Sequence, residues 1–192
     1  MFKLPRIAVC ILGCCLLFAT PSHILAQAAA PAKPAVGSLI PPAQTYGKVL
    51  SIMEQQFVSA AEAMPEDKFN FAPPATMGEF KGVRTFADQI KHVTEANYYF
   101  FHDPSQPTID IRPDIEKLTT KADIVKALKD SFAKAHAFVD TITAENAFVQ
   151  TAHGTRAEIA AFGIAHFMDH YGQIVVYLRM NGIVPPASRG AM

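Results

Sequence analysis

Apolar residues recur at helical spacing in four stretches of the chain, separated by connections rich in proline and glycine. Within residues 45–64 the first apolar stripe consists of Val49, Ile52, Met53 and Phe57. Residues spaced three and four apart share one face of an α-helix, so this pattern predicts an amphipathic helix. Pro65, Pro73 and Pro74 then predict a long irregular connection.

Three further helices are predicted to begin at a threonine that has an acidic residue three positions later. This is the spacing of a capping box, in which the hydroxyl accepts from an amide of the first turn and the carboxylate reaches back. The pairs are Thr85 with Asp88, Thr120 with Asp123, and Thr155 with Glu158. The three helix starts are evenly spaced, but the blocks share little beyond their caps, so we reject an internal repeat.

The three later helices also carry continuous apolar stripes, and the last of them ends clearly. The stripes are Phe86, Ile90, Val93, Asn97 and Phe100; Ile124, Leu128, Phe132, Ala135 and Val139; and Ile159, Phe162, His166, His170, Ile174, Tyr177 and Leu178. Asn181, Gly182 and two prolines at 185–186 follow the last stripe and predict a helix end. No run of alternating strand residues is convincing, so the sequence predicts an all-α four-helix bundle over residues 44–186 with a tail at 187–192.

The first 28 residues have the organisation of a signal peptide. Lys3 and Arg6 give a positive start, residues 7–19 are almost uninterruptedly apolar, and residues 26–28 supply small residues two positions apart. The apolar run is too short for a permanent transmembrane anchor. We therefore expect an exported protein, either periplasmic or secreted.

Removal of this segment also removes every thiol, because the three cysteines are Cys10, Cys14 and Cys15. A lipoprotein signal ending at Cys14 is the alternative, and the apolar stretch after Cys14 disfavours it. Residues 29–43, rich in alanine and proline, are predicted to form a flexible tether. Any metal chemistry of the exported chain must then use nitrogen and oxygen ligands.

The composition limits the classes of partner. Half of the 192 residues are hydrophobic, 18% are charged, and the formal net charge is zero. This chain can bury a substantial core, but it has no basic field for nucleic acid and no acidic tract. We expect no nucleic-acid partner and a small molecule of unknown identity as the substrate or ligand.

His166 and His170 are the first candidates for chemistry. Residues four apart on a helix have Cβ atoms roughly 5–6 Å apart, so both imidazoles can reach one ion. Burying two imidazoles in an apolar stripe is costly unless a partner satisfies them. Two core histidines that bond to tyrosine or aspartate would also fit, so the pair alone is a weak motif.

A metal site requires a third ligand from another helix. His92, within the predicted second helix, is one candidate, and His136 in the third helix is its rival. Periodicity favours His92 but does not decide between them.

Two segments of the chain resemble the DinB/YfiT-like family of metal-binding four-helix bundles. Residues 166–173 together with 177–179, 182 and 185–186 resemble the signature of the family's fourth helix, and residues 85–93 resemble its second helix. The resemblance covers roughly residues 44–186. It implies one divalent ion (zinc, nickel or iron) held by His92, His166 and His170. It further implies an up-up-down-down bundle that can form a homodimer.

An ion held by three neutral imidazoles keeps its double charge and has coordination positions open to solvent or substrate. Such an ion is a Lewis acid that polarises a carbonyl or binds a thiolate. The sequence therefore predicts a metal-dependent enzyme of hydrolase or thiol-transferase type. The alternative is a non-catalytic protein that binds metal or a small ligand. A di-iron bundle ranks last because repeated Glu-x-x-His motifs are lacking.

The remaining polar residues of these helices receive structural roles. Asp88 is expected to cap its helix rather than orient His92, and Gln173 either makes a buried hydrogen bond or binds a ligand. Glu95 and Asp169 are interpreted as solvated charges. Tyr99 and Tyr177 are expected to be core aromatics, and Arg179 is expected to be a charge at the helix C-terminus. The remaining histidines are interpreted as structural or surface residues: His102, His136 and His153.

Overall fold

The computed structural model describes residues 33–103 and 110–190. The chain divides into two units, residues 1–38 and residues 39–192. In the first unit the described residues form a turn, in which the amide of Ser38 donates to the carbonyl of Ala35 (3.1 Å) and Gly37 has a φ of 91°. The predicted signal peptide and the start of the predicted tether lie outside the described residues.

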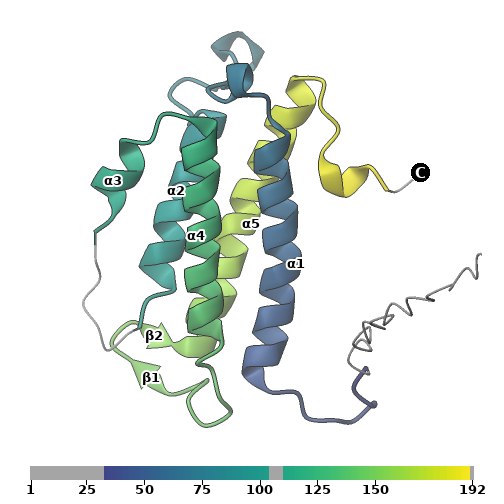
Figure 1. Cartoon of the computed structure of the whole chain (residues 1–192), viewed down its shortest axis with the longest axis vertical. Helices are drawn as coiled ribbons and strands as arrows, with labels where there is room; N and C mark the ends of the chain where they lie inside the picture. Colours follow the sequence, from purple (N-terminus) through teal and green to yellow (C-terminus); the bar gives the residue numbers. More distant parts are fainter. Residues whose placement is uncertain (1–32, 104–109, 191–192) are drawn as a thin grey trace, which may run out of the picture. The chain divides into compact units, whose positions relative to one another are not determined.

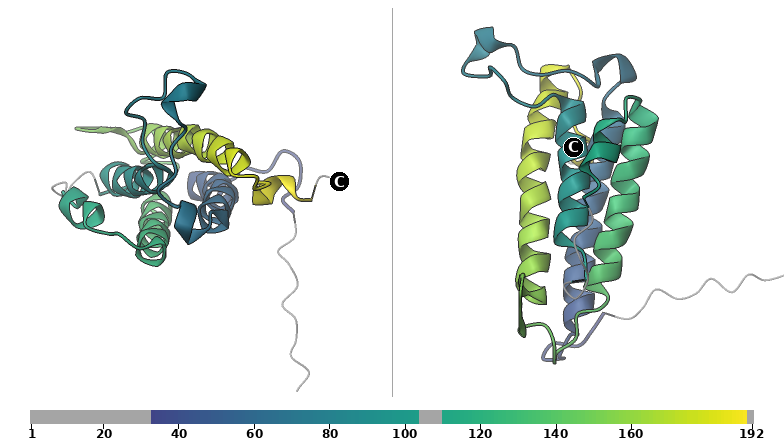
Figure 2. Two further views of the ribbon diagram at one scale, coloured as in Figure 1. Left: turned by 90° about the horizontal axis from the view of Figure 1, so that it is seen from above. Right: turned by 90° about the vertical axis from the view of Figure 1, so that its left-hand side faces the viewer.

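The second unit is a bundle of four long helices, as the apolar patterns predict (Figure 1). The helices are α1 (Pro42–Ala63), α2 (Phe86–Phe100), α4 (Lys121–Val139) and α5 (Arg156–Met180). Seen along the bundle, they form four corners around one interior (Figure 2). Helix α1 begins three residues before the predicted start. Its first residue is a proline, whose fixed φ suits this position and whose missing N–H is not needed there.

The three threonines predicted to begin helices are the N-caps of α2, α4 and α5. The boxes at Thr85 and Thr155 are complete, with the carboxylate of the third helical residue also bonded to the threonine amide. Helix α5 ends in a Schellman motif, in which Ile183 N–H donates to the Leu178 carbonyl and Gly182 N–H to the Arg179 carbonyl. Gly182 has a φ of 75°, which a residue without Cβ adopts without strain.

Short elements supplement the bundle. They are α3 (Arg112–Glu116), three single turns of 3-10 helix (Glu66–Lys68, Ala75–Met77 and Pro186–Ser188), and a hairpin of β1 (Gln150–Thr151) and β2 (Gly154–Thr155). The sequence did not indicate this antiparallel hairpin, because two residues a strand are too few to show alternation.

The order of helix directions differs from the up-up-down-down prediction. In Figure 1, α1 runs upwards, α2 and α4 run downwards, and α5 runs upwards. Contacts fix the parallel pair: the Asn97 amide donates to Ser131 Oγ (3.0 Å), and further along both helices the rings of Phe101 and Phe138 are 5.9 Å apart. The up-up-down-down prediction is therefore wrong, and the observed order is up-down-down-up.

The physical reason lies in the connection that follows α1. This connection was expected to cross the length of the bundle, but it folds back at one end. There the amides of Phe86 and Ala87 donate to the carbonyls of Phe71 and Phe69, both at 2.8 Å. The chain instead crosses between α2 and α4, and α3 packs against α2 on the way.

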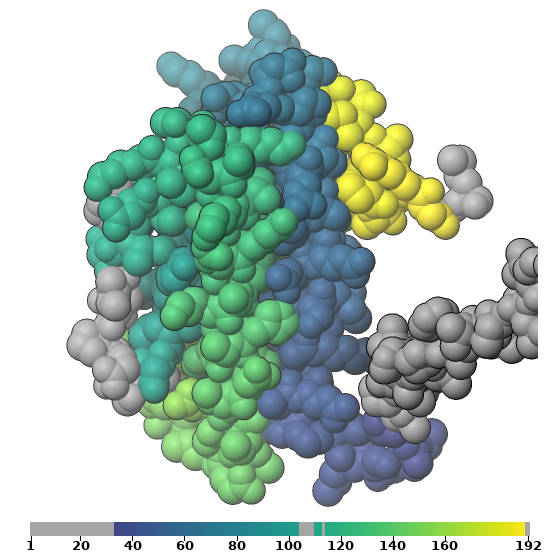
Figure 3. Space-filling model, viewed as in Figure 1, coloured from purple at the N-terminus to yellow at the C-terminus, as the bar shows by residue number. Residues whose placement is uncertain are grey.

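The core contains three phenylalanines from different helices. Phe57 of α1, Phe132 of α4 and Phe167 of α5 are fully buried, and their rings lie 5.2–6.3 Å apart at inclined angles that aromatic pairs favour. The predicted stripes of α2 and α4 face this interior, apart from half-buried Phe100. Figure 3 shows α1 and α4 side by side on one face of the bundle.

Three stripe residues are exposed, contrary to the prediction. Val49 and Ile52 of α1 and Phe162 of α5 are 39%, 44% and 57% exposed. In α1 the buried face is displaced to Leu50, Phe57 and the alanines at 60–61. Apolar residues at helical spacing predict a helix. Which edge of a wide apolar face is buried depends on the elements that pack against it.

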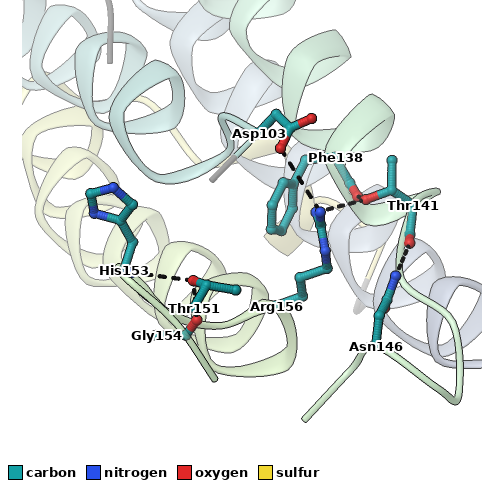
Figure 4. A network of polar contacts seen from close by, with 8 residues as sticks. All are labelled: Asp103, Phe138, Thr141, Asn146, Thr151, His153, Gly154 and Arg156. Carbon is teal, nitrogen blue, oxygen red and sulfur yellow. Dashed lines mark hydrogen bonds and ion pairs between the residues drawn. The ribbon is translucent and has the colours of Figure 1, made fainter. Parts of the chain in front are cut away.

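The end of the bundle at which α4 finishes and α5 begins is closed by a network around Arg156 (Figure 4). Its guanidinium donates to Thr141 Oγ1 (3.1 Å), lies 5.6 Å from the ring centre of Phe138, and is 3.9 Å from an Asp103 oxygen. These contacts tie the first turn of α5 to the last turn of α4. Within residues 33–103 and 110–190, every helix is too short or too polar to cross a lipid bilayer.

Candidate metal centre

The structure brings together the three histidines that the sequence singled out. His92 projects from α2, and His166 and His170 project from adjacent turns of α5. Their ring centres are 4.8–5.3 Å apart, and one potential ligand nitrogen from each ring lies within 4.8 Å of the others. Nitrogens this close together are candidates to bind one divalent ion, which requires about 2.0–2.1 Å to each of them. Among the described residues, no fourth histidine or carboxylate joins this group.

The donor atoms fit a metal ion in a second respect. His166 Nε2 is buried and has no hydrogen-bond partner among the described residues. A buried polar nitrogen without a partner is costly, and native proteins rarely keep one without a ligand or water that satisfies it. Besides the two other histidines, the rings that flank His166 are the apolar Phe100 and Phe162, with centroid distances of 5.3 and 6.4 Å.

Burial keeps all three imidazoles in the neutral form that a metal requires. It is the main cause that lowers the pKa of His92 and His166, and the positive charge of Arg84 lowers both further. For His170, burial and the two neighbouring histidines lower the pKa to about 4. At neutral pH each ring therefore keeps one free lone pair.

A chain of side-chain amides fixes the orientation of His170. Asp169 Oδ2 accepts from the amide of Gln173 (3.2 Å), and Gln173 Oε1 accepts from the amide of Gln89 (2.8 Å). The oxygen of Gln89 then faces His170 Nδ1 at 2.5 Å.

The carboxylate sets the direction of this chain. An ionised carboxylate only accepts, so each amide must turn its oxygen away from Asp169, and Nδ1 of His170 must be the donor. The proton of His170 is thereby placed on Nδ1, and Nε2 carries the lone pair. Partners of this type orient metal-binding histidines and raise their basicity.

The histidines adjoin a cleft of about 770 Å³ between α2, α3 and α5. His92 and His166 line it, together with Glu95, which lies one turn beyond His92 on α2. Arg84 lies at the cleft just before α2 begins. A ligand in this cleft could therefore reach an ion held by the histidines.

Glu95 was interpreted as a solvated charge, but the structure places it in the cleft. Burial raises the pKa of Glu95, and the negative charge of Glu116 raises it further, against the opposing effect of Arg112 and Arg84. Asp88, as expected, caps α2 and bonds to Thr85.

The rival histidine has a different partner. His136 of α4 bonds through Nε2 to a carboxylate oxygen of Glu54 in α1 at 2.7 Å, and both are only partly buried. His102 and His153 pair with each other at a ring distance of 5.4 Å, and they belong to the same end of the bundle as the Arg156 network. These three histidines are not part of the group of His92.

Sequence reasoning missed Gln89, which is 2% exposed and bonds directly to His170. One signal was present: Gln89 lies one turn before His92, just as Gln173 lies one turn after His170. Gln173 was assigned either a buried hydrogen bond or a ligand, and the structure shows the hydrogen bond. Tyr177 is buried and donates to the Arg84 carbonyl (3.1 Å), which agrees with its structural role.

A family model described as the DinB superfamily matches residues 50–174. The match covers almost two thirds of the chain and includes all three histidines of the centre. A search among curated proteins finds no match.

Proposed function

Because the chain belongs to the DinB superfamily, we propose that it is an exported enzyme that acts on a small molecule with one divalent metal ion. His92, His166 and His170 would hold the ion, and the reaction would be a hydrolysis or a thiol transfer. The observation that carries this proposal is the position of the three rings beside the cleft. A structural metal site is closed by a fourth protein ligand, whereas a catalytic site keeps a position open.

The residues of this chain have separate tasks in the proposed function. The bound ion would supply Lewis acidity. The amide chain from Asp169 holds His170 in the tautomer that offers Nε2, and Phe100 and Phe162 flank His166. Glu95, whose pKa is raised mainly by burial, is the cleft residue suited to carry a proton.

Hydrolysis is the better supported of the two reactions. Export, which the first 28 residues indicate, separates the protein from low-molecular-weight thiols, which are mainly cytosolic. The ion could be zinc, nickel or iron, because imidazole ligands suit all three. A non-catalytic metal- or ligand-binding protein is the alternative, and a centre that holds metal without turning over any substrate would favour it.

The decisive experiment measures metal content by elemental analysis in protein from its own host and in two variants. His166→Ala removes the ring with the unpartnered nitrogen, and the variant is expected to contain much less than one metal ion per chain. His136→Ala is the matched control, because it removes the histidine bonded to Glu54 and should retain the metal. Circular dichroism checks that both variants remain helical.

Full metal occupancy in His166→Ala would refute the assignment. Catalysis is tested next with a panel of esters, amides and thiol acceptors, with the metal-free protein and His166→Ala as blanks. Turnover that depends on the metal supports an enzyme, and its absence across the panel in the loaded protein supports the binding alternative.

A further inference from the structure

Arg84 differs from the other described arginines in having no hydrogen-bond or ion-pair partner for its guanidinium among the described residues. Arg112 bonds twice to Asp110, and Arg156 bonds to Thr141. The two C-terminal arginines, Arg179 and Arg189, bond to Ser188 and to the Val184 carbonyl. A guanidinium presents five donors in a planar fork, and those of Arg84 remain available.

The backbone around Arg84 is fixed, so the position of this cation is set by the fold. Its carbonyl accepts from the hydroxyl of buried Tyr177, whose ring packs edge-on against Phe71 at 5.8 Å. The next residue, Thr85, caps α2. The long side chain therefore starts from a defined point between α2 and α5.

Arg84 lies at the cleft beside the histidines, and its charge reaches them. It borders both the 770 Å³ cleft and a smaller neighbouring cavity of about 270 Å³, and both cavities are also lined by His92. Its positive charge contributes to the lowered pKa of all three histidines. A ligand group bonded to Arg84 would therefore lie next to the candidate metal centre.

The other charges of the cleft favour a ligand with a single negative charge over one with two. Arg112 is paired with Asp110, so Arg84 is the one unpaired cation among the described residues that line the cleft, and Glu95 and Glu116 add two carboxylates. A dianion such as phosphate would be repelled by these carboxylates, whereas a carboxylate matches the guanidinium fork with one charge.

The wall beyond Glu95 is apolar and aromatic. It is formed by Ala96, Tyr99 and Phe100 of α2 and by Ile111 before α3. Tyr99 is not the core aromatic that the sequence predicts: it is 62% exposed and packs edge-on against Phe100 at 5.3 Å, so its ring is available to a ligand in the cleft. Such a wall suits the apolar or aromatic body of a ligand.

We propose that the cleft binds a monocarboxylate with an apolar or aromatic body, and that Arg84 is the residue that binds its carboxylate. This inference rests on the proposed function for the role of the neighbouring metal, but not for the contact with Arg84 itself. It names the substrate class of the site as small aromatic or aliphatic monocarboxylates.

The test is calorimetric titration of the zinc-loaded full chain with benzoate at constant ionic strength. Arg84→Gln is expected to weaken benzoate binding about tenfold, because a charge-assisted pair is lost. Arg84→Lys should recover part of the loss through its charge. The matched control is Arg179→Gln, which removes a guanidinium that bonds to Ser188 and does not line the cleft, and it should change the affinity less than twofold.

Benzamide, which has nearly the same shape without the charge, and phosphate should both bind more weakly than benzoate. Three results would overturn the proposal: no saturable benzoate binding by the wild type, equal benzoate affinity in Arg84→Gln, or benzamide binding as tightly as benzoate.

Repeating the titration with metal-free protein tests the contact with Arg84 independently of the metalloenzyme proposal. The ratio of benzoate affinities between wild type and Arg84→Gln should be the same without metal if Arg84 binds the carboxylate directly. Failure of the wild type to hold zinc, nickel and iron alike would end the metalloenzyme proposal, and the ratio of benzoate affinities between wild type and Arg84→Gln would still be measured.

Discussion

Helix α2 carries two buried polar layers, one towards α4 and one towards α5, and they differ in how completely they are satisfied. Towards α4, the Asn97 amide donates to Ser131 Oγ, which in turn donates to the Leu128 carbonyl (2.7 Å). Towards α5, Gln89 bonds to both Gln173 and His170, but the neighbouring His166 keeps a buried Nε2 without a partner among the described residues. We call them the asparagine layer and the histidine layer.

The difference shows what each layer does. A buried polar group whose partners all belong to the chain stabilises one arrangement of the helices. In the other layer, the amides orient one histidine ring but leave ring nitrogens without a partner. Such a layer is arranged to bind a ligand from outside the chain, such as a metal ion. The two layers thus separate fold specificity from ligand binding on one helix.

The largest expected difference between the layers is in their response to pH. In the metal-free protein the pKa of His170 is lowered to about 4 from an unfolded value of about 6.5, with burial as the main cause. The unfolded chain therefore binds more protons than the folded chain in this window. The free energy of unfolding should therefore have its full value above pH 6.5. It should fall by up to about 3 kcal/mol as the pH is lowered to 4.

Urea denaturation across this pH range measures the effect. His170→Gln should flatten the slope, whereas Asn97→Ala should lower the stability at every pH and keep the slope. A wild-type stability that is constant between pH 6.5 and 4 would contradict the prediction.

A second expected difference is in zinc affinity after loss of a buried amide. Gln89→Ala removes the acceptor that holds the Nδ1 proton of His170, and loss of such a partner typically weakens metal binding roughly 10- to 100-fold. Asn97→Ala removes a buried amide of the same helix at a similar depth and should leave zinc affinity unchanged. Competition titration with a chromophoric chelator compares the two, and equal losses would show that Gln89 has no special role.

Local signals in the sequence predicted the helices, and they did so because their causes are local. A threonine with an acidic residue three positions on satisfies the first-turn amides of its own helix, so Thr85, Thr120 and Thr155 could be located without the fold. The end of α5 at Gly182 is local in the same sense. The directions of the helices depend on which connection crosses the bundle, and proline content could not distinguish the two connections.

The candidate centre was only partly accessible from the sequence. The spacing of His166 and His170 placed both on one face of α5, but spacing left His92 and His136 as rivals until the family resemblance decided. In the structure the distinction is plain, because His136 bonds to Glu54. The position of Gln89 one turn before His92 was a weak local signal, but its bond to His170 could not be predicted, because the two residues are 81 positions apart in the sequence.

The smallest expected effect tests whether the two layers are independent. Ser131→Ala removes the oxygen that accepts from Asn97 and leaves that buried amide without this partner, which should cost about 1 kcal/mol of unfolding free energy. Zinc affinity should not change, because mutations at separated sites without shared partners are additive. Thermal denaturation with and without zinc measures both quantities. If Ser131→Ala reduces the stabilisation by zinc as well as the stability of the metal-free protein, α2 transmits strain from one layer to the other. In that case fold specificity and ligand binding are not separate on this helix.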